Sequence, residues 1–372
     1  MKFSIDRAAL LKSLSHVQSV VEKRGTIPIL ANIKLDASDS QLELTATDMD
    51  VAVVDQVAAK VEKSGATTIS AHMLYEIVRK LPDGADVVID EVSSEGKVRI
   101  TSGHSKFALS TLPVDEFPAM AEGELAYSFV LTGAECLALV KKTRFAMSTE
   151  ETRYYLNGVY LHAHESNGSA VLRSVATDGH RLARLEISLP SGASGMPGVI
   201  IPRKTIGELS KLLEEGVEQV KISLSDTKIR FVCGNATLVS KLIDGTYPDY
   251  ERVVPQNNTK IMEVDSAAFA KAVDRVSVIA ADKVRGIKLS MEPGKLTLSA
   301  SSPEHGTAQE TLEVSYSADN IEIGFNARYI IDIMQEIEGG NAQFVFNDSN
   351  SPALVRDSAD VGALYVLMPM RV

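Results

Sequence analysis

The sequence predicts an α+β protein built from three repeated domains, each with antiparallel sheets and two helices. Segments in which apolar and polar residues alternate, such as KVRITSG (97–103) and KIRFVCG (228–234), indicate antiparallel strands with one covered face. The same order of strand and helix signals occurs three times along 372 residues, a length that exceeds what one core fills. Nothing in the pattern supports a parallel doubly wound sheet.

Each repeat begins with a short alternating strand that leads directly into a helical pattern. The three segments are KFSIDRAALLKSL (2–14), SFVLTGAECLALV (128–140) and IMEVDSAAFAKAV (261–273). Asp6, Thr132 and Asp265 stand at the junctions, where a side-chain oxygen can cap the first free N–H groups of a helix. We therefore expect a helix to start at each of these three residues.

Further signals follow in the same order in every repeat. They are the strands NIKL (32–35), GVYL (158–161) and GIKL (286–289), the strand–helix pairs TTISAHMLYEIVRKL (67–81), VIIPRKTIGELSKLL (199–213) and IEIGFNARYIIDIMQEI (321–337), and Pro118, Pro248 and Pro369. Equivalent positions are separated by 126 residues from Leu35 to Leu161 and by 130 from Pro118 to Pro248. The predicted domains are residues 1–126, 127–255 and 256–372.

The composition indicates a globular chain in a reducing compartment. The start, MKFSIDRAALLKSLSH, has no long apolar stretch, and no apolar run reaches the roughly 18–20 residues of a membrane span. Cys136 and Cys233 lie too far apart to indicate a disulfide framework or a zinc site. We expect a cytoplasmic protein that contacts no membrane.

The net charge of −11 hides an uneven distribution. The expected helical segments carry 17 Lys and Arg against 12 Asp and Glu, a net charge of +5, and the remainder carries −16; these segments are 6–24, 71–80, 132–144, 203–214, 265–285 and 326–338. Lys and Arg favour helices in general, which offers a plain alternative. If the helices line one surface, that surface would attract a polyanion through its phosphates, without sequence preference.

The stretch ATDGHRLARLE (176–186) raises the question of acid–base chemistry, because Asp178 and His180 stand close together. The triplet Ala-Thr-Asp also occurs at 46–48, and the third repeat has ASS at 300–302, so part of the stretch belongs to the scaffold. His162 and His164 share a strand face without a third metal ligand, which favours two surface histidines. We predict no catalytic residue, metal or cofactor, and a hydrolase using Asp178 and His180 remains the alternative.

The sequence resembles the bacterial β sliding clamp family, the processivity subunit of DNA polymerase III, over its full length. The resemblance rests on MKFSIDRAALLKSL, IPILANI, TRYYLNGVYL, VATDGHRLA, VIIPRK, SKLIDGTYPDYERVVP, IGFNARYIIDIM and YVLMPMRV. It implies a head-to-tail homodimer that closes into a ring around double-stranded DNA, with the helices lining the hole. The implied partners are the polymerase III alpha subunit, the clamp loader, and other polymerases and repair proteins that bind through short linear peptides. A monomeric peptide-binding scaffold that never touches DNA remains a further alternative.

The resemblance also implies three sets of functional residues. The peptide-binding cleft would be lined by Arg153, Tyr155, Leu156, Thr177, Gly179, His180, Arg181, Leu182, Pro248, Arg252, Val253, Val366, Met368, Pro369, Met370 and Arg371. The DNA contacts would be Arg24, Tyr154, Arg203 and Lys204, and the dimer contact would join Phe107 and Leu109 of one chain to Val278 and Ile279 of the other. His72 stands where the family often has a basic residue, so that DNA contact is expected to be weak at neutral pH. Core packing within each domain is the alternative for the dimer residues and for Met368 and Met370.

Overall fold

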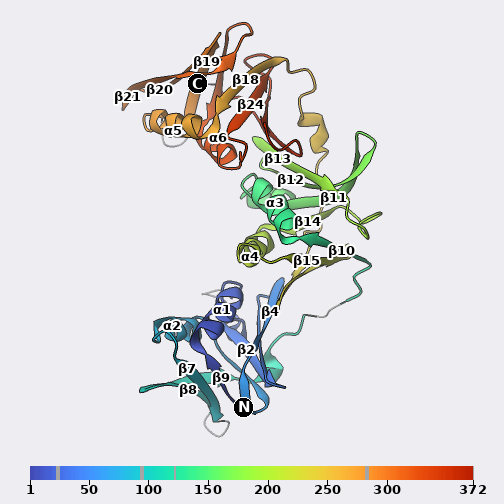
Figure 1. Cartoon of the computed structure of the whole chain (residues 1–372), viewed down its shortest axis with the longest axis vertical. Helices are drawn as coiled ribbons and strands as arrows, with labels where there is room; N and C mark the ends of the chain where they lie inside the picture. Colours follow the sequence, from blue (N-terminus) through green and yellow to red (C-terminus); the bar gives the residue numbers. More distant parts are fainter. Residues whose placement is uncertain (22–25, 93–95, 121–122, 281–284, 372) are drawn as a thin grey trace. The chain divides into compact units, whose positions relative to one another are not determined.

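The computed structural model describes residues 1–21, 26–92, 96–120, 123–280 and 285–371. The chain forms two compact units, shown with their elements in Figure 1. The first unit contains residues 1–137, 190–197 and 201–243, and the second contains 138–189, 198–200 and 244–372. Among the described residues, no helix is long and apolar enough to cross a membrane.

The first unit is built on one 13-stranded sheet in which the described pairings are antiparallel. The strand order is β10-β15-β16-β17-β4-β3-β2-β6-β9-β8-β7-β1-β5. The strands are β1 (Lys2–Asp6), β2 (Asn32–Ser38), β3 (Gln41–Thr47), β4 (Val51–Ala58), β5 (Lys60–Lys63), β6 (Gly65–Ser70), β7 (Asp86–Val92), β8 (Lys97–Ser102), β9 (Ser105–Leu112), β10 (Tyr127–Thr132), β15 (Gln219–Leu224), β16 (Lys228–Cys233) and β17 (Ala236–Lys241). Pairing of β4 with β17, with Ala52 opposite Val239, makes the sheet continuous from the first repeat into the second.

Three helices of this unit bury one apolar stripe each. They are α1 (Arg7–Val17), α2 (Ala71–Lys80) and α4 (Arg203–Leu213), while α3 (Gly133–Arg144) begins in the first unit and ends in the second. Leu10, Leu14 and Val17 of α1 are fully buried, and α1 packs on α2 and β4. This spacing of three and four residues places the three side chains on one helix face, where their burial drives the packing.

The second unit contains a nine-stranded and a four-stranded antiparallel sheet. Their orders are β14-β11-β12-β13-β26-β25-β24-β18-β22 and β21-β20-β19-β23. The strands are β11 (Gly158–Ser166), β12 (Ser169–Thr177), β13 (Arg181–Ser188), β14 (Val199–Pro202), β18 (Lys260–Asp265), β19 (Gly286–Glu292), β20 (Lys295–Ser302), β21 (Gly306–Glu313), β22 (Ser315–Tyr316), β23 (Ile321–Asn326), β24 (Asn341–Phe346), β25 (Ala353–Asp357) and β26 (Ala363–Leu367), with the helices α5 (Ser266–Ser277) and α6 (Ala327–Met334). Here β13 pairs with β26, with Leu182 opposite Val366, which repeats the junction of β4 with β17.

The predicted repeat and its helix starts are confirmed. Asp6 Oδ1 accepts from the Ala9 N–H at 2.9 Å, and Asp265 Oδ1 accepts from the Ala268 N–H at 2.7 Å. Thr132 and Glu135 form a reciprocal capping box, with N–H to oxygen distances of 3.1 and 2.9 Å. Each repeat contributes two of the described α-helices, so the α+β prediction of three similar domains is also confirmed.

Three predicted helix ends were wrong. We expected helices over 6–24, 265–285 and 326–338, but they end at Val17, Ser277 and Met334. Beyond each end the backbone tightens into i→i+3 hydrogen bonds, and the apolar residues that prolong the helical pattern, such as Val20 and Ile337, are buried in these turns. Residues 22–25 and 281–284 lie outside the described residues.

Candidate functional site

The Ala-Thr-Asp triplets at 46–48 and 176–178 build the same turn in two repeats. Thr177 Oγ1 donates to the Arg181 carbonyl at 2.6 Å, and Asp178 Oδ1 accepts from the His180 and Arg181 N–H groups at 2.9 and 3.0 Å. In the first repeat, Thr47 Oγ1 donates to the Val51 carbonyl at 2.9 Å and Asp48 Oδ1 accepts from two N–H groups in the same way. The triplet is therefore scaffold, as predicted from its repetition.

The middle position of this turn has a left-handed backbone in both repeats. Gly179 has a φ of 88°, and the corresponding Met49 has a φ of 79°. A Cβ on Gly179 would lie 2.8 Å from Nη1 of Arg153. Glycine here relieves the backbone strain and leaves room for the guanidinium of Arg153 beside the turn.

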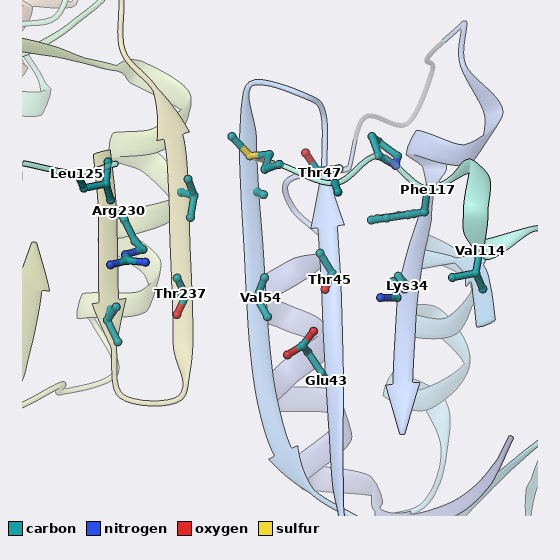
Figure 2. Close-up of a pocket in the computed structure, with 16 residues that line it drawn as sticks. Lys34, Glu43, Thr45, Thr47, Val54, Val114, Phe117, Leu125, Arg230 and Thr237 are labelled. Carbon is teal, nitrogen blue, oxygen red and sulfur yellow. The ribbon is translucent and has the colours of Figure 1, made fainter. Parts of the chain in front are cut away.

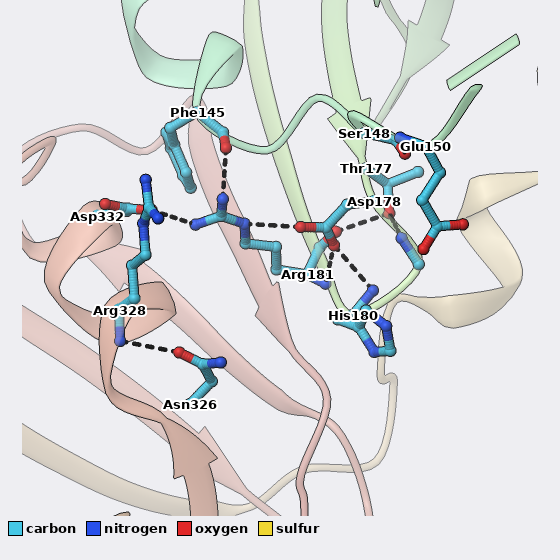
Figure 3. A network of polar contacts seen from close by, with 11 residues as sticks. Phe145, Ser148, Glu150, Thr177, Asp178, His180, Arg181, Asn326, Arg328 and Asp332 are labelled. Carbon is cyan, nitrogen blue, oxygen red and sulfur yellow. Dashed lines mark hydrogen bonds and ion pairs between the residues drawn. The ribbon is translucent and has the colours of Figure 1, made fainter. Parts of the chain in front are cut away.

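Arg181 ties this turn to two other parts of the second unit. Its Nε donates to Asp178 Oδ2 at 3.0 Å, Nη1 donates to Asp332 Oδ2 at 2.5 Å, and Nη2 donates to the Phe145 carbonyl at 2.6 Å (Figure 3). The guanidinium carbon also lies 4.3 Å from the centre of the Tyr329 ring. With the residue only 9% exposed, the guanidinium serves contacts within the chain.

Asp178 and His180 do not form an acid–base pair. Both carboxylate oxygens of Asp178 accept from backbone N–H groups or from the Arg181 guanidinium, and among the described contacts neither oxygen is bonded to the imidazole of His180. The exposed ring of His180 lies 6.4 Å from that of Tyr329 at an interplanar angle of 23°. No group of three His, Cys, Asp or Glu in the described part of the chain is arranged to hold a metal ion.

Nine of the sixteen predicted cleft residues line one cavity of about 180 Å³ in the second unit. We call it the Leu182 cavity; it is lined by Leu156, Thr177, Gly179, Arg181, Leu182, Pro248, Asp249, Tyr250, Val253, Val366 and Met368. Its surface is mainly aliphatic with a few polar groups, as in sites that take apolar side chains of a ligand. Asp249 and Tyr250 were missed by sequence reasoning, although they adjoin Pro248 in the quoted YPDYERV stretch.

The other seven predicted cleft residues do not line this cavity; they are Arg153, Tyr155, His180, Arg252, Pro369, Met370 and Arg371. Arg153 pairs with Glu150 at 3.1 Å, and the exposed Arg252 pairs with Asp249 at 2.7 Å. The C-terminal segment runs along the turn and β23, because the Met368 N–H donates to the His180 carbonyl and the Met370 N–H donates to the Gly324 carbonyl, both at 2.9 Å.

Hydrogen bonds with His162 and Arg173 hold the side chain of Tyr250, which forms part of the cavity wall. His162 Nδ1 faces the Ala163 carbonyl at 3.1 Å, and Nε2 lies 3.0 Å from the Tyr250 hydroxyl. A carbonyl only accepts, so Nδ1 carries the proton and the Tyr250 hydroxyl donates to Nε2, while the hydroxyl oxygen accepts from Arg173 at 3.0 Å. Burial lowers the pKa of His162, which agrees with a neutral ring.

His162 also stacks on Tyr160, with ring centres 4.6 Å apart, and Tyr160 stacks on Tyr247 at the same separation. We expected His162 to be a surface histidine, but it is only partly exposed, because Tyr160 and Tyr250 pack against its ring. The alternating pattern of the strand placed the side chain on the correct face, but it could not show that residues 247–250 pack against that face.

The predicted DNA-contacting residues have different surroundings. Tyr154 is exposed, and Arg203 and Lys204 are partly exposed at the start of α4. Lys204 Nζ lies 2.5 Å from Asp48 Oδ2 and donates to the Val20 carbonyl at 2.9 Å. Arg24 lies outside the described residues, and His72 is exposed on α2.

The predicted dimer residues are not buried within the chain. Val278 is 75% exposed and Phe107 is 37% exposed, while Leu109 and Ile279 are partly exposed. Phe107 and Leu109 lie on β9, and Val278 and Ile279 follow α5. Core packing, the alternative for these four residues, does not fit this exposure.

Comparison with known proteins covers the whole chain. Family models described as the DNA polymerase III beta subunit match in three parts, the N-terminal domain at residues 1–121, the central domain at 131–249 and the C-terminal domain at 251–371. The beta sliding clamp of Caulobacter vibrioides is 51% identical and that of Escherichia coli K12 is 38% identical, each over the full length of both chains.

Solved structures give the same result. The beta sliding clamp of C. crescentus, 51% identical, has a TM-score of 0.96 over 100% of this chain and 99% of that chain. The sliding clamp of Bartonella birtlesii bound to griselimycin, 46% identical, has a TM-score of 0.96 over the whole of both chains. The chain therefore belongs to the DNA polymerase III beta subunit family, the beta sliding clamps, which are non-catalytic processivity factors that tether a polymerase to DNA.

Proposed function

We propose that this chain acts in the cytoplasm through a helical surface for DNA, a cleft for partner peptides and an interface for a second copy. The domains are proposed to span residues 1–126, 127–255 and 256–372, which is supported by the three family matches at 1–121, 131–249 and 251–371. Cys136 and Cys233 are free and buried, which suits a reducing compartment.

The observation that carries the DNA assignment is the charge of the helices. The six described α-helices hold 13 Lys and Arg against 5 Asp and Glu, a net charge of +8, in a chain whose total is −11. The net positive charge of the observed helices is larger than that of the predicted helical segments, because most acidic residues of those segments lie outside the observed helices. Cations confined to helices attract the phosphate backbone, while the acidic remainder repels it elsewhere.

Individual DNA contacts are proposed for Arg24, Tyr154, Arg203 and Lys204. Lys204 is held by Asp48, so its charge is partly neutralised before DNA arrives. Contacts of this kind carry no sequence information and hold the DNA weakly at high salt. Retention must then come from closure of the chain pair around the duplex.

The Leu182 cavity is the proposed centre of the peptide cleft. Its aliphatic lining from Leu182, Val253 and Val366 suits an apolar anchor side chain, and Met368 adds an adaptable contact. His180 belongs to the turn, Arg153 lies beside Gly179, and Arg252 pairs with the lining residue Asp249. These three side chains are proposed to contact the polar parts of a peptide.

Retention on circular DNA tests encirclement. The protein is loaded onto nicked circular DNA by a clamp loader, washed at high salt and then treated with a nuclease that linearises the circle. We expect the protein to remain on the circle and to be released on linearisation, because topology rather than affinity holds it. Equal retention on circular and linear DNA would show that the chain binds DNA without encircling it.

A further inference from the structure

A second cavity, of about 460 Å³, lies in the first unit at the junction of β4 and β17. It is formed by β2, β3, β4, β16 and β17 together with residues 114, 117–120 and 125, which lie between β9 and β10. In Figure 2, Arg230 and Leu125 line one side of it, and Lys34 and Phe117 line the other. We call it the Arg230 cavity.

The internal repeat makes the Arg230 cavity a counterpart of the Leu182 cavity. A shift of 130 residues relates Thr47 to Thr177, and the pairing of Ala52 with Val239 corresponds to that of Leu182 with Val366. Six lining positions correspond in this way: Thr47 and Thr177, Ala52 and Leu182, Pro118 and Pro248, Ala119 and Asp249, Met120 and Tyr250, and Val239 and Val366. Both junctions therefore place a cavity beside the same pair of strands.

The two cavities differ in what fills the space beside the strands. At the second junction, Tyr160 and Tyr247 stack with ring centres 4.6 Å apart. Lys34 is paired with Thr45 as Tyr160 is with Val175, so Lys34 stands where the second junction has Tyr160. Phe117 takes the place of Tyr247, so the first junction has no aromatic pair at these two positions. The cavity beside it is also larger, about 460 Å³ against about 180 Å³, and its lining includes Lys34, Glu43 and Arg230.

Arg230 differs from the other charged residues of this cavity, because it has no hydrogen bond or ion pair with the described residues. Lys34 lies 3.4 Å from Asp36, and Glu43 accepts from Gln56 at 3.0 Å. The Nε–H of Arg230, in contrast, is buried and finds no acceptor among the described residues. A buried donor without an acceptor costs free energy, and an Arg230 guanidinium that turns toward a carboxylate in the cavity would gain the acceptor that Nε lacks.

We propose that the Arg230 cavity binds a short extended segment of a partner protein that presents an apolar side chain next to a carboxylate. The apolar side chain packs against Val54, Val239 and Phe117, and the carboxylate accepts from Arg230. This gives one chain a second, chemically distinct peptide site at its first domain junction. The proposal rests on the assignment of the Leu182 cavity to peptides, through the repeat that relates the two cavities.

Disulfide tethering tests the proposal, because it can detect peptides that bind the cavity only weakly. Cys136 and Cys233 are buried, so a Thr237→Cys variant offers one accessible thiol on β17, within the cavity lining. Two peptide amides, Cys-Gly-Leu-Val-Asp and Cys-Gly-Leu-Val-Asn, are supplied as mixed disulfides with 2-mercaptoethanol and equilibrated with the variant against increasing free 2-mercaptoethanol. The thiolate of the variant displaces 2-mercaptoethanol from the peptide disulfide, and intact mass gives the fraction tethered. The charge-assisted hydrogen bond predicts a roughly tenfold preference for the Asp peptide.

Two controls assign that preference to Arg230 and to the cavity. In the double variant with Arg230→Gln, the two peptides should be retained equally, whereas Arg230→Lys should keep part of the preference because it keeps the charge. A Ser169→Cys variant, with its thiol exposed at the start of β12, should show no preference. Equal retention at position 237, a preference that survives Arg230→Gln, or the same preference at position 169 would each overturn the proposal. The readout involves neither DNA nor the Leu182 cavity, so it is independent of whether those assignments hold.

Discussion

The guanidinium of Arg181 is held by acceptors from three parts of the second unit: the turn before β13, the segment after α3 and helix α6. A buried cation with three acceptors is a structural link, and its removal would leave the carboxylates of Asp178 and Asp332 without their nearest cation. Its position beside the Leu182 cavity means that the same link fixes the shape of the cavity wall. Sequence reasoning assigned this residue to peptide binding and had no signal for Asp332 or the Phe145 carbonyl as partners.

Replacing Arg181 by Met should destabilise the second unit by roughly 3 kcal/mol, because breaking a buried ion pair strands the remaining charge. Arg328→Met is the matched control: Arg328 is 70% exposed and lies 4.0 Å from the same Asp332, so its loss should cost less than about 1 kcal/mol. The chain has no tryptophan, so urea unfolding is followed by circular dichroism. Equal shifts of the two midpoints would contradict the structural role of Arg181.

Two histidines should give opposite pH dependence of stability. Burial disfavours the charged form of His16, but its hydrogen bonds to Asp55 and Glu215, at 3.1 and 2.6 Å, outweigh this and raise its pKa. The stability that His16 contributes is therefore complete below the unfolded pKa of about 6.5 and is lost as pH rises through the folded value. For His162 the pKa is lowered by burial, so its contribution is complete above about 6.5 and is lost as pH falls through the folded value.

Thermal unfolding from about pH 5 to pH 8 separates the two effects. His16→Gln should reduce the loss of stability on the alkaline side of this range, and His162→Gln should reduce it on the acid side. The two variants serve as controls for each other, since each leaves the other histidine in place. If either variant flattened the opposite side of the profile, the assigned protonation states would be wrong.

At the scale of elements, the starts of helices were predictable and the ends were not. Asp6, Thr132 and Asp265 mark starts because one side-chain oxygen satisfies a local N–H group, and this depends on residues three apart. Val20 and Ile337 continue the apolar pattern of α1 and α6 but are buried in the turns beyond the helix ends, so the pattern alone could not show where the helices stop. Tyr250 could not be inferred as a partner of His162, because it lies 88 residues away in the sequence.

The C-terminal segment after β26 supplies an element-scale test of the cleft. Met368 lines the Leu182 cavity, whereas Val361, seven residues earlier, is fully exposed in the loop before β26. Met368→Asp should weaken binding of a fluorescein-labelled peptide carrying the clamp-binding segment of the polymerase III alpha subunit by at least about tenfold, because it places a charge against an apolar anchor. Val361→Asp should leave the affinity unchanged in fluorescence polarisation. Similar affinities for both variants would remove the Leu182 cavity from the proposed cleft.

For the whole molecule, a ring requires that two chains join at surfaces left open within one chain. Strand β9 pairs with β8 from Ser105 to Ser110 and with β6 only at Thr111 and Leu112, so much of its second edge has no described partner. Strand β21 is likewise an edge of the four-stranded sheet. Lys106 lies on β9, and Glu310 and Glu313 lie on β21, where Glu310 is paired with Arg275 at 2.5 Å. Two open edges suit a head-to-tail contact that covers both.

Apolar residues beside these edges provide the test of this contact. Val278 follows α5, which packs on β21, and Phe107 lies on β9; both are exposed. Val278→Asp or Phe107→Asp should shift the protein from dimer to monomer, because a carboxylate would have to be desolvated at the interface. Met73→Asp, which alters an exposed apolar residue of α2, is the matched control and should leave the dimer intact. Sedimentation velocity across a dilution series measures the dissociation constant. If Val278→Asp and Phe107→Asp have the same dissociation constant as the Met73→Asp control, the two chains join at another surface.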